Sequence, residues 1–174
     1  MEVIAALILI VVIFALLFVI LSSFLFMFDL FLDLPYVATD KKKIETIMKF
    51  ADLKKNQTAI DLGSGDGRLL LASAKKGAAA IGYELNPFLI AITKIRAKAK
   101  GASAQIIVKR SDLWKADLKI ADVVFVYGRK RTMQKFEDFV YKNSKKGTRI
   151  IVNTNQFPSN QPIKSENNIF LYIK

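Results

Sequence analysis

The fold is decided by the stretch Thr58–Gly67, which reads T-A-I-D-L-G-S-G-D-G. Its first five residues are mostly apolar, as in a short buried strand, and the remainder alternates glycine with small polar residues. Glycine tolerates positive φ, so such a segment can turn sharply and bring its backbone close to a ligand. The stretch therefore predicts a strand that ends in a ligand-binding turn, directly before a helix.

Strands and helices alternate downstream of this turn. The predicted strands are Thr58–Leu62, Ala79–Glu84, Ala104–Val108, Ala121–Tyr127, Thr148–Val152 and, within a tail that allows one or two, Ile169–Ile173. The predicted helices between them are Asp66–Lys76, Pro87–Lys100 and Thr132–Tyr141. Strands that are apolar on both faces belong to a covered parallel sheet. We therefore expect an α/β fold: a Rossmann-like, doubly wound, mostly parallel sheet.

Helix caps set the expected helix boundaries. Asn86 is suited to the N-cap of the helix that begins at Pro87, and Gly101 is suited to its end. Asp66 is the expected N-cap of the helix after the glycine turn. Thr39 or Asp40 is expected to cap an earlier helix that ends near residues 52–53.

The N-terminus carries a long uncharged segment. Residues 3–28 contain no charged side chain, and only Ser22 and Ser23 are polar. About 20 apolar residues cross the hydrocarbon core of a bilayer, so this segment predicts one transmembrane helix. We expect three parts: an anchor at residues 1–28, a juxtamembrane connector at 29–39 and a Rossmann-like domain at 40–174.

Charge predicts the orientation and the partners. All 27 Lys and Arg follow the span, and three of the 15 acidic residues precede Leu34, which leaves 12 acidic against 27 basic residues, a net charge of +15. The positive-inside rule then places the domain in the cytoplasm of a single-pass membrane protein. Such a charge attracts anionic partners, of which a lipid surface is expected and nucleic acid is possible but not favoured.

The chain contains neither cysteine nor histidine. Disulfides, zinc sites built from those residues and catalysis by an imidazole base are therefore excluded. No metal site is expected, and any proton transfer must use Asp, Glu, Lys, Tyr or water.

Three acidic residues close the predicted strands. Asp61 precedes the glycine turn and suits a ligand ammonium, whereas Glu84, at the end of the next strand, suits two ribose hydroxyls. Asp112, followed by Leu113, can accept from an adenine amino group while the apolar neighbour covers the ring. A nicotinamide cofactor requires Gly-x-Gly-x-x-Gly, and here the third glycine comes one residue early.

With these residues the chain resembles class I S-adenosylmethionine-dependent methyltransferases over residues 40–174. The resemblance implies S-adenosyl-L-methionine as cofactor. It implies cofactor contacts from Asp61, Gly63, Gly65, Glu84, Asp112 and Leu113.

The order of anchor, P-Y-V-A-T, capped helix and D-L-G-S-G-D-G-R is similar to that of membrane-anchored protein-lysine methyltransferases. That family includes the mitochondrial enzymes that modify the ATP synthase c-subunit and the adenine nucleotide translocase. The resemblance implies that Tyr36 and Thr39 lie near the cofactor, and that the substrate is a lysine of a membrane or membrane-proximal protein.

The exit of the fourth strand departs from that family. Tyr127 is a candidate for orienting the substrate, but the basic residues at 129–131 would repel a lysine and attract phosphate or carboxylate. Two alternatives therefore stay open beside a protein-lysine methyltransferase. The chain could methylate a lipid, small molecule or RNA, or it could be an inactive, membrane-tethered cofactor-binding adaptor.

Overall fold

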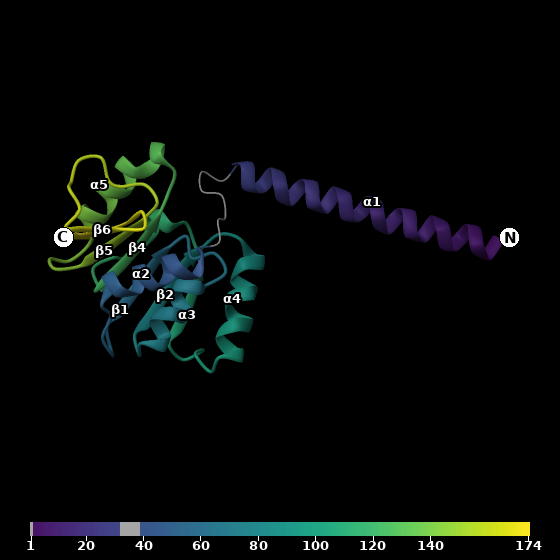
Figure 1. The fold of residues 1–174 in the computed structure, drawn as a ribbon. Coiled ribbons are helices and arrows are strands. Elements are labelled where there is room, and N and C mark those ends of the chain that lie inside the picture. The colour runs from purple at the N-terminus through teal and green to yellow at the C-terminus, as the bar shows by residue number, and fades with distance from the viewer. Residues whose placement is uncertain (1, 32–38) are drawn as a thin grey trace. The chain divides into compact units, whose positions relative to one another are not determined.

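The structure is a computed structural model that describes residues 2–31 and 39–174. The chain divides into two compact units, residues 1–36 and 37–174 (Figure 1). The predicted site residue Tyr36 and most of the predicted connector lie outside the described residues.

The described part of the first unit, residues 2–31, forms one helix, α1 (Glu2–Phe31). Its part Glu2–Ser23 has a mean hydropathy of 3.6, and none of it is buried. This length and composition are sufficient to cross a membrane.

The second unit contains seven strands and four α-helices among residues 39–174. In chain order they are α2 (Lys41–Ala51), β1 (Thr58–Leu62), α3 (Arg68–Lys75), β2 (Ala79–Glu84), α4 (Pro87–Ala99), β3 (Ile106–Arg110), β4 (Val123–Tyr127), α5 (Met133–Asn143), β5 (Arg149–Asn153), β6 (Lys164–Glu166) and β7 (Ile169–Ile173). Short 3₁₀ turns lie at Leu113–Lys115 and Lys130–Thr132.

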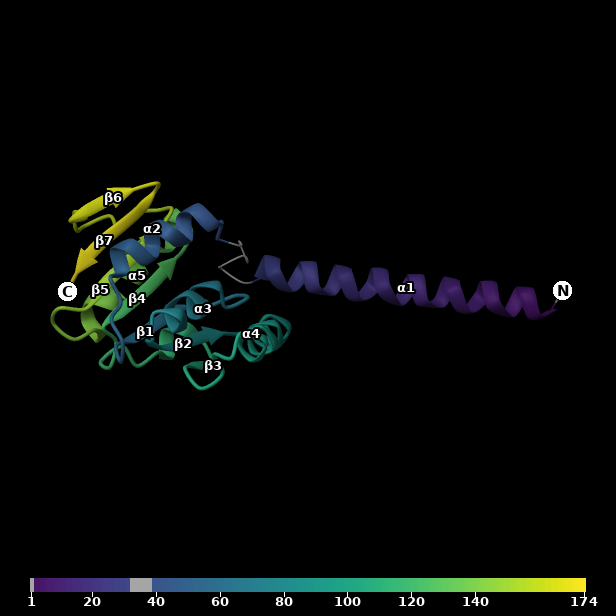
Figure 2. The ribbon, with the colours of Figure 1, turned by 60° about the horizontal axis from the view of Figure 1, so that its bottom comes forward.

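All seven strands form one sheet in the order β3-β2-β1-β4-β5-β7-β6 (Figure 2). The first five strands are parallel, and β7 is antiparallel to both β5 and β6. The predicted mostly parallel, Rossmann-like sheet is therefore confirmed. The order reverses between β1 and β4, and ligands of open α/β sheets bind at such a switch point, beyond the carboxyl ends of the strands.

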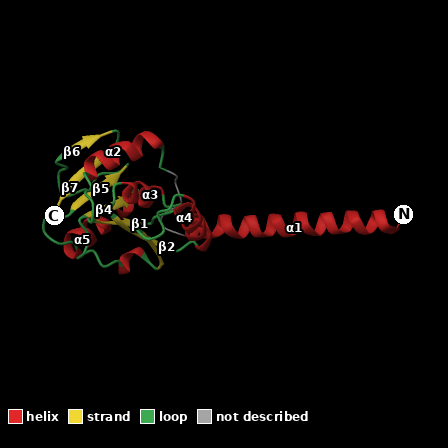
Figure 3. Ribbon diagram, turned by 90° about the horizontal axis from the view of Figure 1, so that it is seen from below, coloured by secondary structure: helices red, strands yellow, loops and turns green. Residues whose placement is uncertain are grey.

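Helices cover both faces of the sheet. α2, α3 and α4 lie on one face, and α5 lies on the other (Figure 3). The core forms where α2 packs against the centre of the sheet, with Ile47 and Phe50 buried against Val123, Phe125 and Ile151. α2 therefore holds the segment that enters the domain against the centre of the sheet.

Several local expectations are confirmed. Asp40 is the N-cap of α2, where its carboxylate accepts from the backbone N–H of Lys43 at 2.9 Å. Asn86 caps α4 in the same way. The tail forms the two strands β6 and β7.

One predicted cap and several strand boundaries were wrong. Asp66 does not cap α3, which begins two residues later behind Gly67, a residue with φ +78° and no side-chain cap bond. Asp66 instead pairs with arginines, and this satisfies its carboxylate more strongly than backbone amides do. β3 lies two residues later than predicted, because Lys109 and Arg110 extend the parallel pairing with β2 despite their charge. β4 begins at Val123, since Ala121 and Asp122 belong to the turn before it.

Candidate active site

The glycine turn lies at the carboxyl end of β1, at the centre of the sheet. Gly63 and Gly65 have φ of +91° and +53°, which glycine adopts without strain. The backbone N–H groups of Gly63 and Ser64 both donate to the carbonyl of Tyr83 in β2, at 3.0 and 3.1 Å. The turn is thus fixed to the neighbouring strand by its own backbone.

Glu84 closes the turn from the end of β2. One carboxylate oxygen accepts from the N–H of Gly65 at 2.9 Å, and the other accepts from the N–H groups of Leu85 and Asn86 at 2.9 and 2.8 Å. A carboxylate has about four acceptor sites, so three of them are already occupied. Two ribose hydroxyls would therefore have to displace at least one of these backbone donors.

Asp61 is a buried carboxylate on the penultimate residue of β1, only 7% exposed. No side chain or backbone group of residues 39–174 hydrogen-bonds to it or pairs with it. Burial, followed by the charges of Glu84 and Asp66, raises the pKa of Asp61 from 3.8 to about 7. A cation placed beside it would lower this pKa again, so the position favours a positively charged ligand group.

Asp66 connects three elements around the turn. Its carboxylate pairs with Arg96 of α4 and, at 3.0 Å, with Arg68 of α3. Arg68 also donates to the backbone carbonyl of Thr39 at 2.9 Å. Thr39 thus lies beside the helix that follows the turn, on the side from which the chain enters the domain. Buried Thr93 of α4 adds a hydrogen bond to the carbonyl of Gly65 at 3.2 Å.

Asp112 and Leu113 lie at the exit of β3. The carboxylate of Asp112 accepts from the N–H of Trp114 at 3.1 Å and so caps the 3₁₀ turn. Leu113 is buried, and its side chain comes within 4.0 Å of the position that a Cβ on Gly63 would occupy. Leu113 and the glycine turn therefore face each other across the carboxyl edge of the sheet.

Tyr127 ends β4 next to Asn153 of β5 and is half-buried. The basic segment 129–131 follows it and leads into α5 through a 3₁₀ turn, with Arg129 half-buried and the next two residues exposed. Asn155 donates to the carbonyl of Gly128 at 2.8 Å, which ties the exits of β4 and β5 together.

Two further residues belong to the candidate site and were not predicted from the sequence. Leu85 follows Glu84 directly and is 41% exposed, an apolar side chain left open at the ligand edge. Gly82 leaves room for Ser64, because a Cβ there would lie 2.7 Å from the Cβ of Ser64. An apolar residue after the strand-ending acid could have signalled Leu85, whereas no local pattern marks Gly82.

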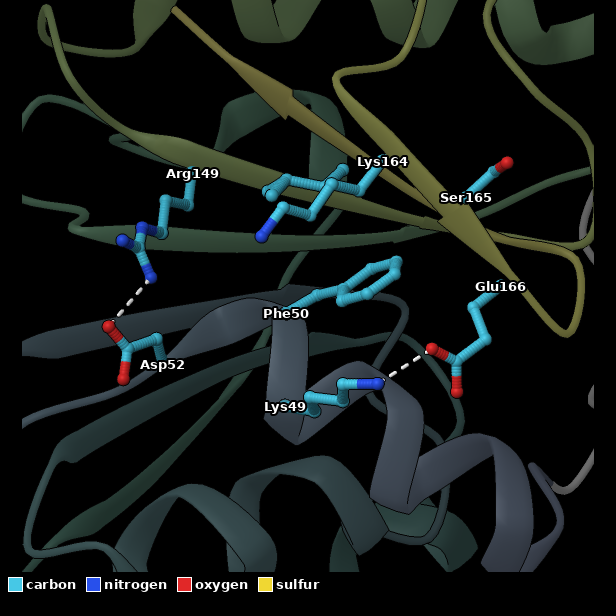
Figure 4. Close-up of a pocket in the computed structure, with 8 residues that line it drawn as sticks. Lys49, Phe50, Asp52, Arg149, Lys164, Ser165 and Glu166 are labelled. Carbon is cyan, nitrogen blue, oxygen red and sulfur yellow. Dashed lines mark hydrogen bonds and ion pairs between the residues drawn. The ribbon is translucent and has the colours of Figure 1, made fainter.

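A cavity of about 480 Å³ lies elsewhere, between the end of α2, the start of β5 and the β6–β7 hairpin (Figure 4). Lys49 points to Glu166 at 2.7 Å and Arg149 to Asp52 at 3.2 Å, so its charges largely neutralise one another. None of the candidate site residues lines it, and it is separate from the carboxyl edge described above.

The sequence of the domain was compared with models of known protein families. Residues 61–164 match the model of the ANTKMT methyltransferase domain, a range that begins at Asp61 and extends to the first residue of β6. The chain belongs to the ANTKMT methyltransferase family. As an ANTKMT-family chain it has the class I methyltransferase fold described above.

Relatives within and beyond the ANTKMT family agree with this assignment. The mouse adenine nucleotide translocase lysine N-methyltransferase is 33% identical over 76% of this chain and 58% of its own length. The human lysine N-methyltransferase of the ATP synthase c-subunit is 34% identical over 72% of this chain and 53% of its own length. The chain thus spans little more than half the length of these relatives. A Salinibacter ruber RNA methyltransferase, solved with S-adenosyl-L-homocysteine, superposes with a TM-score of 0.75 at 25% identity, over 79% of this chain and 93% of its own.

Proposed function

We propose that this protein is an S-adenosylmethionine-dependent methyltransferase that methylates a lysine amine of a membrane or membrane-proximal protein. The observation that carries the proposal is the buried carboxylate of Asp61 at the glycine turn, which has no partner among residues 39–174, in a member of the ANTKMT family. The names of the mouse and human relatives support lysine as the acceptor.

The cofactor S-adenosyl-L-methionine fits the groups at the edge of the sheet. In the proposal, Asp61 pairs with its ammonium, and Gly63 and Gly65 let the backbone approach it closely. Glu84 takes the ribose hydroxyls after releasing a backbone donor such as the N–H of Gly65. Leu113 covers the adenine, with Leu85 on the opposite side.

Two residues complete the proposed cofactor site. Asp112 accepts from the adenine amino group, since its carboxylate uses one oxygen for the 3₁₀ cap and keeps the other available. Thr39 lies at the entrance, where its contact with Arg68 holds the entering chain near the turn.

When bound, the cofactor would supply an electrophilic methyl group: a lysine amine, held neutral, would form a C–N bond to the methyl carbon as the C–S bond breaks, and the sulfur would leave as a neutral thioether. The protein must therefore hold the lysine nitrogen about 3–3.5 Å from the methyl carbon and exclude water. In the proposal, Tyr127 orients that amine, which its half-buried position at the neighbouring strand exit supports. Desolvation beside a sulfonium lowers the pKa of the amine, so no separate base is required.

The apolar helix Glu2–Ser23 serves in this proposal as a single membrane anchor. Lysines 41–43 follow it, and by the positive-inside rule they favour a cytoplasmic domain. A C-terminal tag should then resist protease in intact cells and be cleaved after permeabilisation. Cleavage of the tag in intact cells would contradict this orientation and place the domain outside.

Calorimetric titration of S-adenosyl-L-methionine into the detergent-solubilised chain tests the cofactor site. Wild type should bind, and Asp61→Ala and Glu84→Ala should each lose at least about tenfold in affinity, or 1.4 kcal/mol. Asp138→Ala is the matched control, since it removes an exposed carboxylate on α5. Absence of binding to folded wild type would overturn the enzyme proposal and favour the inactive adaptor.

A second candidate is methylation of an anionic substrate, such as RNA or a lipid. The basic segment 129–131 at the strand exit and the +15 charge of the domain favour it. Tritiated methyl groups from the cofactor should appear in the protein fraction if lysine is the acceptor. Label in RNA or lipid, with none in protein, would replace the first candidate by the second.

A further inference from the structure

Helix α4 has two apolar faces, although only one of them packs against the domain. Ile90, Thr93 and Ala97 are buried toward the sheet. Phe88, Ile92 and Ile95 are 58%, 39% and 68% exposed. Because an α-helix turns about 100° per residue, these three fall on the side opposite the buried face.

Basic residues border the exposed apolar face. Lys94, Arg96, Lys98 and Lys100 occupy the second half of the helix and its end, and residues 86–101 contain no acidic residue. Arg96 is held by Asp66, whereas the lysines at 94, 98 and 100 are exposed. At the helical period, Lys98 lies beside one edge of the apolar face and Lys100 beside the other.

We propose that this face of α4 docks into the headgroup region of an anionic lipid bilayer. Helices that lie in the plane of a membrane carry large apolar side chains on one face and lysines beside it, and bury that face about 5–10 Å deep. The lysine stems can extend along the apolar surface while their ammonium groups reach lipid phosphates. Basic residues close to an anionic leaflet add an electrostatic attraction to this apolar contact.

The charge of the chain argues against a second copy as the occupant. A twofold contact through this face would bring the same lysines of both copies together. Each domain also carries the net charge of +15, so like charges would repel over the whole approach. An anionic membrane surface has the complementary charge.

The chain also keeps the domain near such a surface. Residues 24–39, sixteen in all, separate the apolar segment Glu2–Ser23 from the first cap of the domain. At about 3.6 Å per residue they span at most about 60 Å. The inference uses the membrane anchor proposed above, but it does not depend on methyl transfer.

Because the chain contains no cysteine, a single introduced cysteine can be labelled selectively. The whole chain carrying Ile95→Cys is labelled with an environment-sensitive fluorophore and reconstituted into vesicles of phosphatidylcholine, with or without phosphatidylglycerol. Acyl chains that carry a doxyl quencher then report contact with lipid. Lys146→Cys is the control, because that exposed residue precedes β5 and lies on another element.

Quenching of about twofold at position 95 is expected in vesicles with phosphatidylglycerol, weaker quenching without it, and none at position 146. Ile92→Glu should remove the quenching at position 95, whereas Ile92→Leu should keep it. Flotation of the chain with vesicles without quenching at position 95 overturns the docking face alone. Equal quenching at positions 95 and 146 overturns it as well. Quenching that rises with the density of protein in the vesicles, and not with the amount of quencher lipid, has the same consequence. Failure to float overturns both the anchor and the docking face.

Discussion

Substitution of Asp61 by asparagine should stabilise the protein while abolishing its affinity for the cofactor. The carboxylate is buried without a partner among residues 39–174, and its pKa is raised from 3.8 to about 7. Between these two values the folded state retains a proton that the unfolded chain has released. Stability therefore falls as pH rises through this window and levels off above about 7.

The size of the effect follows from the shift. A pKa raised by about three units lowers the free energy of unfolding by about 4 kcal/mol above pH 7. By linkage, the loss is only about 2 kcal/mol at roughly pH 5. Asparagine cannot ionise, so the variant escapes this penalty. Desolvation of its own buried amide offsets part of this gain in stability. We expect Asp61→Asn to be about 2–4 kcal/mol more stable than wild type at roughly pH 8, with the advantage falling by about 2 kcal/mol near pH 5.

Urea denaturation in one detergent, followed by fluorescence, measures this difference. Trp114 is the only tryptophan of the chain, and its ring lies 4.6 Å from that of Phe136, so its emission reports the core of the domain. All other titrating groups are shared, so the difference between the two proteins isolates position 61. A variant that is less stable at high pH, or an advantage that does not change with pH, would refute the reasoning. Added cofactor should stabilise wild type and leave the variant unchanged.

Three further substitutions test the framework around the site with the same denaturation assay. Gly82→Ala places a methyl group 2.7 Å from the Cβ of buried Ser64 and should lower the free energy of unfolding by about 1–3 kcal/mol. An unchanged urea midpoint would show that the glycine turn can shift to accommodate the methyl group. Arg96→Leu removes a cationic partner of buried Asp66 and should cost about 1.5–3 kcal/mol, with Arg96→Lys recovering part of it; equal losses in both variants would exclude the ion pair as the cause. Tyr172→Phe leaves a buried backbone N–H without its acceptor at 2.9 Å and should cost about 1–3 kcal/mol, whereas the exposed Gln161→Ala should change nothing.

The two apolar faces of α4 show how far a local pattern can be interpreted. Apolar residues recur along Pro87–Ala99 without a clear polar side, and this alone predicts a buried helix. The structure buries only Ile90, Thr93 and Ala97, because α4 lies on the outside of the sheet with nothing packed over it among residues 39–174. Which apolar face is buried depends on the neighbours of the helix, and those are known only after folding.

The sequence by itself determined the elements, their order and the identity of the chemistry-bearing residues. Strand propensity, helix caps such as Asn86, and the glycines of the turn act within a few residues, so their effects can be inferred from neighbours in the chain. The parallel sheet followed from the alternation of elements. Asp61 and Glu84 could be placed at one edge because the carboxyl ends of parallel strands coincide.

The tertiary structure alone decided how these groups are partnered. Asp66 looked like a helix cap, but Arg96, 30 residues later, binds its carboxylate. Glu84 looked free for a ribose, yet it holds the N–H of Gly65, and Asp61 is left in a buried place where its pKa rises. Hydrogen bonds, ion pairs and desolvation depend on distances of a few ångströms between residues far apart in the chain, and these distances exist only once the sheet and its covering helices have assembled.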